Sequence, residues 1–352
     1  MCGIVGYSGP KEPLPILING LSRLEYRGYD SAGIAISDGN KITVEKKEGK
    51  LDVLKNHLKD SNIKGNIGIG HTRWATHGVP NDVNAHPHSD NSEEFAIIHN
   101  GIIENYAEIK KDLLEEGFEF KSDTDTEVVA VELSRKWNGE LLRTVTEVAK
   151  TLEGTYALVV TTTKEEGTIV AGRLMSPLVL GVGENEVFLA SDSAAILEHT
   201  NKMIFLENGD FVEIKNGQYK LFDSDLNEIE REIQEIDWEV SEAEKLGHDH
   251  FMYKEILEQA EVIERTISGR LELTSEEIPI NLDEASKYEK IWIVACGTAY
   301  HAGLFGKDLF EKVLGVPVSV ELASEFRYRE PIVGANDLGI VISQSGETMD
   351  TI

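Results

Sequence analysis

Short apolar runs and amphipathic segments follow one another without regular alternation over residues 1–223. Four runs rich in β-branched and other apolar residues predict strands. These runs are residues 42–44, 96–98, 156–161 and 187–189. Leucine and isoleucine at helical spacing predict a helix over residues 14–24. Because strands outnumber helices and the two do not alternate regularly, the pattern indicates a layered antiparallel α+β fold.

Two further helices are expected after the middle strands. One begins near Asn105. The other begins at Thr124, which is followed three residues later by Glu127 and then by an apolar stretch. A Ser or Thr with Glu three residues further on, just before an apolar stretch, is the sequence signature of a capping box at a helix N-terminus.

The segment after residue 223 differs from the rest of the chain in charge. Residues 223–290 contain 21 acidic and 7 basic side chains, a net charge of −14. The whole chain has 63 acidic and 34 basic side chains, a net charge of −29. About half of the net charge therefore lies in under a fifth of the sequence. Such a run predicts a solvated linker followed by exposed helices, and we place the linker at residues 224–247.

Three strand-like runs separated by helix-length segments follow the acidic segment. They are Ile291–Ala295, Val316–Val320 and Leu338–Ile342. This order predicts βαβ units and a parallel sheet, so we expect two domains, residues 2–223 and residues 248–352. A parallel sheet needs helices on both faces, and the sequence stops where a covering helix should begin. We therefore expect the 352 residues to be the front part of a longer polypeptide, with an incomplete second domain.

Composition and charge exclude several classes of protein. With 41% hydrophobic residues the chain can form more than one core. Its negative charge repels phosphate backbones and anionic membrane surfaces, so neither nucleic-acid nor membrane binding is expected. No apolar run approaches the roughly 18 residues that span a bilayer, and the first residues do not resemble a signal peptide. Two cysteines are too few for a disulfide framework, which favours a cytoplasmic location.

Cys2 becomes the first residue if Met1 is removed. An N-terminal cysteine carries both a thiol and an α-amine, and an α-amine with a pKa near 8 can accept the thiol proton directly or through water. The alternative is a small buried apolar residue, which free cysteine often is. The run that begins at Cys2, CGIVG, predicts that a strand pins the chain terminus, as a catalytic terminus requires.

Six motifs, in order along the chain, resemble those of the class II glutamine amidotransferases. They are CGIVG (2–6), LEYRGYDSAG (24–33), HTRWATHG (71–78), NAHPH (84–88), HNGIIEN (99–105) and SDTDTEV (122–128). The resemblance covers essentially the whole chain. It implies a four-layer αββα Ntn-hydrolase sandwich followed by an incomplete α/β domain of the sugar-isomerase (SIS) type, which is flavodoxin-like.

The resemblance assigns roles in binding glutamine to two charged residues. Arg73 would grip the α-carboxylate, because the planar guanidinium matches two oxygens. Asp125 would bind the α-ammonium, and its place in the first helical turn stabilises its charge. An ordinary ion pair for Arg73 and a simple preference for helix starts for Asp125 remain as alternatives.

Asn100 and Gly101 would stabilise the oxyanion that forms when the thiol attacks the amide. An amide side chain and a backbone N–H can both point at the developing charge. The alternative is a hairpin turn, which an Asn-Gly dipeptide strongly favours.

Three more residues of the motif HTRWATHG, which contains Arg73, complete the glutamine site by resemblance. Trp74 would close the pocket, and Thr76 and His77 would line it, whereas ordinary loop packing is the alternative. Arg27 resembles the residue that couples this lobe to the second site.

Five histidines could instead suggest a metal site. They are His71, His77, His86, His88 and His99. They lack the HExxH spacing and a cysteine companion, so neither a metal nor another cofactor is expected.

The second domain carries a Ser- and Gly-rich turn, residues 343–348, directly after a strand. Hydroxyls and backbone N–H groups in such a turn can hold a phosphate, although these residues also serve as helix N-caps. Neither a P-loop nor a GxGxxG fingerprint occurs. Resemblance to sugar-isomerase domains assigns the sugar phosphate to Cys296, Gly297, Thr298, Ser343, Gln344, Ser345 and Thr348. A buried apolar role for Cys296 remains the alternative.

The resemblance implies an enzyme that hydrolyses L-glutamine through Cys2 and delivers ammonia to fructose 6-phosphate, forming glucosamine 6-phosphate and glutamate. The family continues into a second sugar-isomerase domain, so we expect this chain to retain only the glutaminase half. The full-length form would be a homodimer. Alternatives are another amidotransferase of this class and a catalytically inert sugar-phosphate sensor or interaction module.

Overall fold

The computed structural model describes residues 2–25, 30–74, 78–236, 248, 250–267, 287–343, 348 and 350–351. The chain divides into two compact units, Met1–Gly247 and His248–Ile352. In the described residues, no helix is both long enough and apolar enough to cross a bilayer.

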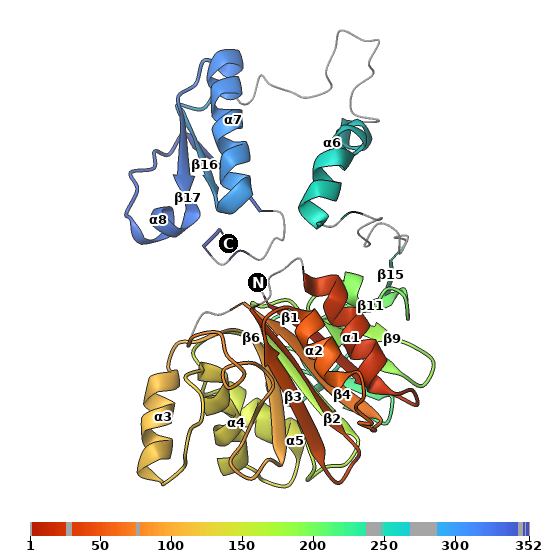
Figure 1. The fold of residues 1–352 in the computed structure, drawn as a ribbon. Helices are drawn as coiled ribbons and strands as arrows, with labels where there is room; N and C mark the ends of the chain where they lie inside the picture. The colour runs from red at the N-terminus through yellow and green to blue at the C-terminus, as the bar shows by residue number, and fades with distance from the viewer. Residues whose placement is uncertain are drawn as a thin grey trace. The chain divides into compact units, whose positions relative to one another are not determined.

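The described part of the first unit contains two antiparallel sheets (Figure 1). The first has eight strands there, in the order β15 (Gln234–Glu235), β11 (Lys202–Phe205), β9 (Val179–Val182), β10 (Val187–Ala190), β1 (Gly3–Ser8), β4 (Ile67–Arg73), β2 (Ser31–Ser37) and β3 (Ile42–Glu48). The second has seven, in the order β14 (Glu228–Ile229), β13 (Gln218–Phe222), β12 (Phe211–Lys215), β8 (Thr168–Leu174), β7 (Gly154–Thr162), β6 (Phe95–Ile103) and β5 (His88–Ser89). All four expected strand runs lie within these strands.

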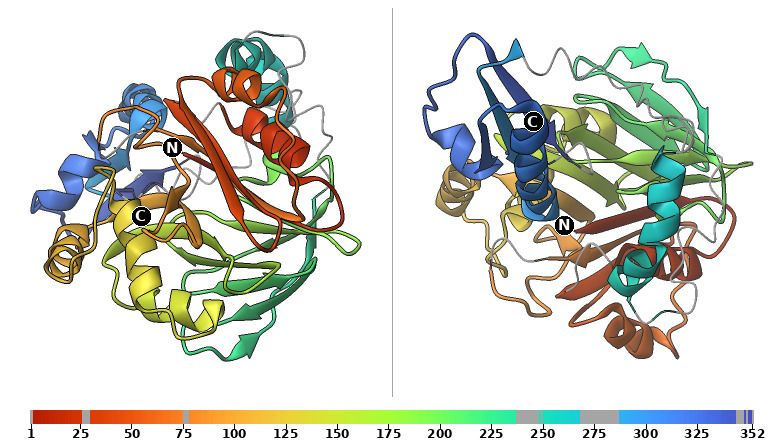
Figure 2. Two further views of the ribbon diagram at one scale, coloured as in Figure 1. Left: turned by 60° about the horizontal axis from the view of Figure 1, so that its bottom comes forward. Right: turned by 90° about the horizontal axis from the view of Figure 1, so that it is seen from above.

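The two sheets pack face to face, and helices cover their outer faces (Figures 1 and 2). The helices α1 (Pro13–Leu24) and α2 (Leu51–Leu58) cover the first sheet. The helices α4 (Asp125–Arg135) and α5 (Leu141–Ala149) cover the second, and α3 (Tyr106–Glu115) packs on α4. A short 3₁₀ helix, η2 (Ser193–Ala195), lies beside α1. This arrangement is the expected four-layer αββα sandwich.

Alternation along β1 explains how one strand serves two layers of the core. Ile4 packs into the cluster between the two sheets, and Val5 packs into the cluster under α1. Both side chains are fully buried. Successive side chains of a strand point to opposite faces, so a strand in the middle of this sandwich is apolar on both sides. The run CGIVG therefore begins a central strand.

Part of the segment that we assigned to a linker belongs to the sheets. Glu228 pairs with Phe222 in the second sheet, and Gln234 pairs with Met203 in the first. Residues 224–236 thus run from one sheet to the other, which corrects the linker expectation for these residues. Residues 237–247 lie outside the described residues.

The second unit contains a parallel sheet of three strands in its described residues. Its order is β17 (Val318–Leu322), β16 (Lys290–Ala295) and β18 (Asp337–Ile342). The helices α7 (Gly297–Leu314) and α8 (Ala323–Tyr328) connect the strands, and α6 (Phe251–Ile267) precedes them. The expected βαβ order is confirmed, with the second strand two residues later than predicted.

Candidate functional site

The first residues of the chain are held in the middle of the first sheet. Strand β1 lies between β10 and β4. The N–H of Ile4 donates to Ser191 Oγ over 3.0 Å, and the N–H of Ser191 donates back to the Ile4 carbonyl over 3.1 Å. A Cβ on Gly3 would lie 2.6 Å from Thr72 Oγ1, so the close approach of β4 requires glycine there. Cys2 is thus placed by a rigid strand.

The thiol of Cys2 is half-buried beside the end of β4. The backbone N–H of Trp74 donates to Cys2 Sγ over 3.2 Å. Burial raises the pKa of the Cys2 thiol, and the Trp74 N–H and the charge of Arg73 oppose that rise. A raised pKa keeps the sulfur protonated at neutral pH, so its reaction with an amide needs a base that removes the proton.

Arg73 and Trp74 follow one another where β4 ends, and they differ in exposure. Arg73 is 3% exposed, whereas Trp74 is 57% exposed. Arg73 Nη2 donates to the Gly78 carbonyl over 3.3 Å, and its own carbonyl accepts the N–H of Asp30 over 2.7 Å. The structure thus places a buried guanidinium next in sequence to the residue that contacts the thiol.

Asn100 and Gly101 lie within strand β6 and not in a hairpin turn, which overturns the alternative reading of this dipeptide. Asn100 pairs with Ala157 and Gly101 with Tyr156 on β7. Gly101 has a φ of 134°, and a Cβ there would lie 2.0 Å from the Thr155 carbonyl oxygen. Only glycine fits this conformation and this approach.

The side-chain amide of Asn100 joins the two sheets at the site. Its Nδ2 donates to the Cys2 carbonyl over 3.1 Å. Its Oδ1 lies 2.9 Å from Nε2 of His71 on β4. Asn100 is 7% exposed and His71 is fully buried, so both bonds are sheltered from water. The sequence motifs that begin at residues 2, 71 and 99 therefore meet at one place.

Four of the five histidines form a buried cluster at β4, β5, β6 and the first residues of α4. The rings of His71 and His86 stack with centroids 4.3 Å apart, and His88 meets the edge of His86 at 4.7 Å. Thr126 Oγ1 lies 2.9 Å from His86 Nε2 and 2.9 Å from His99 Nδ1. Burial lowers the pKa of His71 to about 3 and the pKa of His86 and of His88 well below the usual value. These three rings are therefore neutral at physiological pH.

The Nε2 atoms of His71, His86 and His88 each lie against an oxygen of the protein. Three hydroxyl or carbonyl groups serve as partners: Thr124 Oγ1 for His88, Thr126 Oγ1 for His86, and the carbonyl of His99 for His71. Across the described residues, no group of three His, Cys, Asp or Glu side chains could hold a metal ion.

Asp125 lies at the first position of α4 and is 5% exposed. Its Oδ2 accepts the N–H of Ile103 over 2.9 Å, which ties α4 to the end of β6. Thr124 caps the helix by accepting the N–H of Glu127 over 3.3 Å. The Glu127 carboxylate reaches past Thr124 to the N–H groups of Lys121 and Ser122, at 2.8 and 2.6 Å. The expected helix start at Thr124 is therefore confirmed. The Glu127 side chain accepts from Lys121 and Ser122, whereas in a standard capping box it would accept from the backbone N–H of the N-cap residue.

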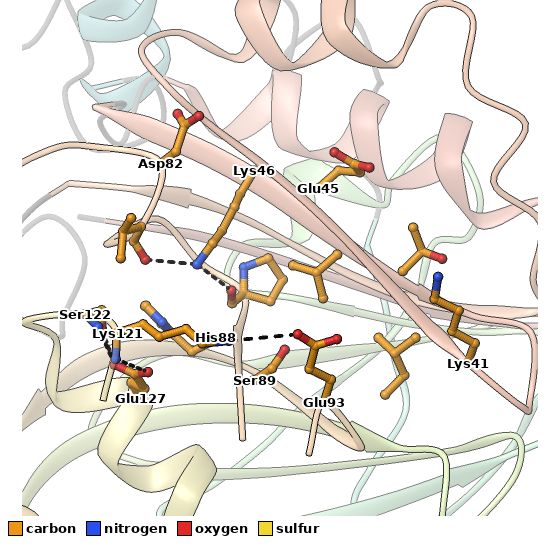
Figure 3. A pocket seen from close by; sticks show the side chains of 15 residues that line it. Lys41, Glu45, Lys46, Asp82, His88, Ser89, Glu93, Lys121, Ser122 and Glu127 are labelled. Atoms are coloured by element: carbon orange, nitrogen blue, oxygen red, sulfur yellow. Dashed lines mark hydrogen bonds and ion pairs between the residues drawn. The ribbon is translucent and has the colours of Figure 1, made fainter. Parts of the chain in front are cut away.

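A cavity of about 560 Å³ opens between β3 and β5, and His88 is one of the residues that line it (Figure 3). Cys2 is not among its lining residues. At one end the Lys46 ammonium turns toward backbone carbonyls and donates to Val83, Ala85 and Pro87 over 2.9, 2.8 and 3.2 Å. This amine is thus already engaged, and the cavity is separate from the thiol site.

In the second unit, the expected sugar-phosphate residues follow two adjacent strands. Ala295 pairs with Ile342 at the ends of β16 and β18, so Cys296 and Ser343 lie at the same edge of the sheet. Cys296 is the N-cap of α7, and Thr298 in the first turn is exposed. The Thr348 carbonyl accepts the N–H of Thr351 over 2.7 Å.

Five expected site residues lie outside the described residues: Arg27, Thr76, His77, Gln344 and Ser345. Sequence analysis also missed one contact at the site. It considered His71 only as a metal ligand, whereas the structure places this ring against Asn100. A histidine inside a strand, two residues before Arg73, was the available signal.

Comparison with known proteins agrees with this geometry. A family model described as a glutamine amidotransferase domain matches residues 56–243, and one described as a SIS domain matches residues 285–352. Glutamine–fructose-6-phosphate aminotransferase (isomerizing) of Clostridium perfringens is 50% identical over 100% of this chain and 58% of its own length. The Aquifex aeolicus protein of that name is 47% identical over 100% of this chain and 59% of its own. The chain thus spans under three fifths of these relatives.

A solved structure supports the same architecture. Glutamine phosphoribosylpyrophosphate amidotransferase from B. subtilis matches with a TM-score of 0.58 and 22% identity, covering 95% of this chain and 69% of that one. At this identity the likeness concerns the fold alone. It confirms the four-layer αββα sandwich, and the SIS match confirms the type of the parallel sheet. The chain therefore belongs to the family of glutamine amidotransferases, and a SIS domain match follows the amidotransferase domain.

Proposed function

We propose that the first unit hydrolyses L-glutamine with Cys2 as the nucleophile. After removal of Met1, the α-amine of Cys2 takes the thiol proton and the sulfur attacks the side-chain carbonyl carbon of glutamine. Ammonia leaves with that proton, and water then cleaves the thioester to release glutamate. The observation that carries the proposal is that the Trp74 N–H and the Asn100 side chain both contact Cys2, with Arg73 at the end of β4 directly before Trp74.

Arg73 and Asp125 bind the two charged ends of the amino acid in this proposal. Both side chains are almost fully buried. The planar guanidinium matches the two oxygens of the α-carboxylate, and the carboxylate of Asp125 is opposite in charge to the α-ammonium. Trp74, Thr76 and His77 would line and close the pocket over the bound glutamine.

Asn100 and Gly101 stabilise the oxyanion of the tetrahedral intermediate. An amide nitrogen carries two N–H groups, and the contact with the Cys2 carbonyl uses one of them. The second can donate to oxygen on the carbon that the Cys2 sulfur attacks. One such donor is worth about 10²- to 10³-fold in kcat.

The second unit would bind a sugar phosphate at the carboxyl ends of its strands. The chain leaves β16 for β17 on one side and then crosses to β18 on the other, so the order of the strands reverses between β16 and β18. Ligands of open α/β sheets bind at such a point. We assign the ligand to residues of the α7 N-terminus and of the segment that follows β18 in the sequence: Cys296, Gly297, Thr298, Ser343, Gln344, Ser345 and Thr348.

We propose that, in a protein of the relatives' full length, ammonia from glutamine is delivered to fructose 6-phosphate to form glucosamine 6-phosphate. The names of the relatives support this substrate, and Arg27 would couple the two sites. We expect that protein to be a cytoplasmic homodimer. Within the present chain we place the glutaminase domain at residues 2–223 and the start of the SIS domain at residue 248.

A glutamine-like electrophile tests the proposed nucleophile. The chain is incubated with a diazoketone analogue of glutamine, and intact mass and peptide mapping report the modified residue. We expect one adduct on Cys2 in molecules that lack Met1, with protection by L-glutamine. Labelling that is spread over Cys2 and Cys296 and insensitive to glutamine would contradict a glutamine site at Cys2.

A further inference from the structure

We propose that His71 is a positioning residue, which holds the Asn100 side-chain amide with its nitrogen toward Cys2 and its oxygen away. This inference rests on the proposed glutamine hydrolysis, in which the Asn100 nitrogen donates to the oxyanion. His71 lies on β4 and Asn100 on β6, so the contact fixes one sheet against the other at the reacting atoms.

Two acceptors determine where the imidazole of His71 carries its proton. Nε2 of His71 lies 3.0 Å from the His99 carbonyl oxygen and 2.9 Å from Asn100 Oδ1. A carbonyl oxygen can only accept, so Nε2 must be the protonated nitrogen, and its N–H is shared between the two oxygens. Nδ1 of His71 is buried without a hydrogen-bond partner among the described residues. Leaving Nδ1 unprotonated and unpaired in the interior costs less free energy than burying an Nδ1–H without an acceptor.

The His71 tautomer in turn selects one orientation of the Asn100 amide. If the amide were flipped, its NH₂ group would face the Nε2–H of His71, which places two donors against each other. Moving the His71 proton to Nδ1 would not relieve this, because Nε2 would then face the His99 carbonyl as a second acceptor. Every alternative thus leaves a buried polar group unpaired. The orientation that presents Nδ2 to the Cys2 side is the one that satisfies all partners.

The surroundings of His71 keep the ring in place. Its side chain is fully buried, and the His86 ring stacks on it at 4.3 Å with an interplanar angle of 29°. The ring stays neutral because burial lowers the pKa of His71 to about 3. The orienting N–H therefore stays in place at neutral pH.

A double-mutant cycle distinguishes positioning through Asn100 from a general structural role. We expect His71→Leu to lower kcat for glutamine by about 10²-fold, close to the loss in Asn100→Ala. The KM for glutamine should change by less than about threefold. In the Asn100→Ala background, His71→Leu should cost less than about twofold more, since a residue that acts through Asn100 has nothing left to position. A further loss of about 10²-fold in the double variant would overturn the proposal.

Rescue and reactivity give two further readouts. His71→Gln restores an N–H near the position of Nε2, so we expect its kcat to lie within about tenfold of the wild type. Alkylation of Cys2 by iodoacetamide forms no oxyanion, so its rate should be unchanged in His71→Leu. The control His199→Leu changes a partly buried histidine that stacks on Phe188, and it should leave kcat unchanged. Equal losses in His71→Gln and His71→Leu, with both folded, would contradict positioning by an N–H.

The tautomer can be measured without any activity. In the ¹⁵N-histidine-labelled chain, His71 should give the spectrum of a neutral ring protonated at Nε2, with no change between pH 5 and pH 8. An Nδ1–H ring, or titration of His71 near its ordinary pKa, would overturn the proposal. If the wild-type chain without Met1 releases no ammonia, the proposed hydrolysis fails, and this spectrum still decides the orientation of Asn100.

Discussion

The backbone N–H of Trp74 donates to Cys2 Sγ over 3.2 Å, which joins the end of β4 to the first residue before β1. The same strand β4 contributes Arg73 and His71. Strand β4 and the residue that follows it thus provide a contact to the thiol, a buried cation and the ring beside Asn100. A displacement of the end of β4 would therefore disturb several parts of the site at once.

The thiol of Cys2 should react slowly with alkylating reagents at neutral pH. Burial raises its pKa above the usual value near 9, so little thiolate is present at pH 7. We expect the rate of Cys2 alkylation by iodoacetamide, followed by peptide mass, to keep rising with pH beyond pH 9. A plateau reached below pH 8 would show a thiol of lowered pKa and contradict this account.

Gly101→Ala should damage both stability and activity. The φ of 134° is strained for alanine, and the new Cβ would lie 2.0 Å from the Thr155 carbonyl oxygen. We expect a loss of about 1–3 kcal/mol or more in the free energy of unfolding. The control Gly139→Ala has a φ of 101° with nothing within 4 Å, so it should show only the smaller backbone cost. Equal losses in urea unfolding of the two variants would argue against crowding at Gly101.

Asp125→Asn should weaken glutamine binding while the fold persists. Asparagine keeps an oxygen for the Ile103 N–H, which Asp125 accepts over 2.9 Å, but loses the charge proposed to hold the α-ammonium. We expect KM to rise by about 10- to 100-fold with little change in kcat, as for a lost charge-assisted bond. Asp52→Asn, in the first turn of α2 with a 76% exposed side chain, is the matched control. An unchanged KM in Asp125→Asn would exclude this role.

The stability of the first unit should fall as the pH falls below about 7. The pKa values of His71, His86 and His88 are lowered by burial, so only the unfolded chain binds protons at these rings as the pH drops through about 6.5. The free energy of unfolding then decreases by about 1.4 kcal/mol per pH unit for each ring. Urea unfolding at pH 7, 6 and 5 measures this slope. We expect His88→Gln to reduce the pH dependence of the free energy of unfolding by the contribution of one ring, about 1.4 kcal/mol per pH unit. An unchanged slope in that variant would contradict the account.

The sequence predicted those helices and strands whose apolar spacing is visible within a single stretch of residues. The amphipathic spacing over residues 14–24 corresponds to α1, because one face of that helix packs on the first sheet. The apolar runs near residues 291 and 338 correspond to β16 and β18, which pair in parallel. Five of the six residues of β16 are buried, as expected for a strand in the middle of a parallel sheet. The strands β14 and β15 have two residues each, which is too short for any periodicity to reveal.

The site depends on contacts that no local pattern encodes. His71 and Asn100 are 29 residues apart and lie on different sheets. The Asn-Gly dipeptide at residue 100 favours a turn when considered alone. Pairing with nine residues of β7 overrides that preference and keeps Gly101 in the strand. Motif resemblance located Cys2 and its neighbours, but the orientation of the Asn100 amide follows only from the packed sheets.

Ammonia release from L-glutamine by the purified chain tests the central claim most directly. Wild type and Cys2→Ala are compared, and intact mass establishes that Met1 is absent from the wild type. The account predicts steady release of ammonia and glutamate in equal amounts from the wild type and none above background from Cys2→Ala. Equal rates in the two proteins, or no release by a folded wild type that lacks Met1, would contradict the assignment of Cys2 as the nucleophile.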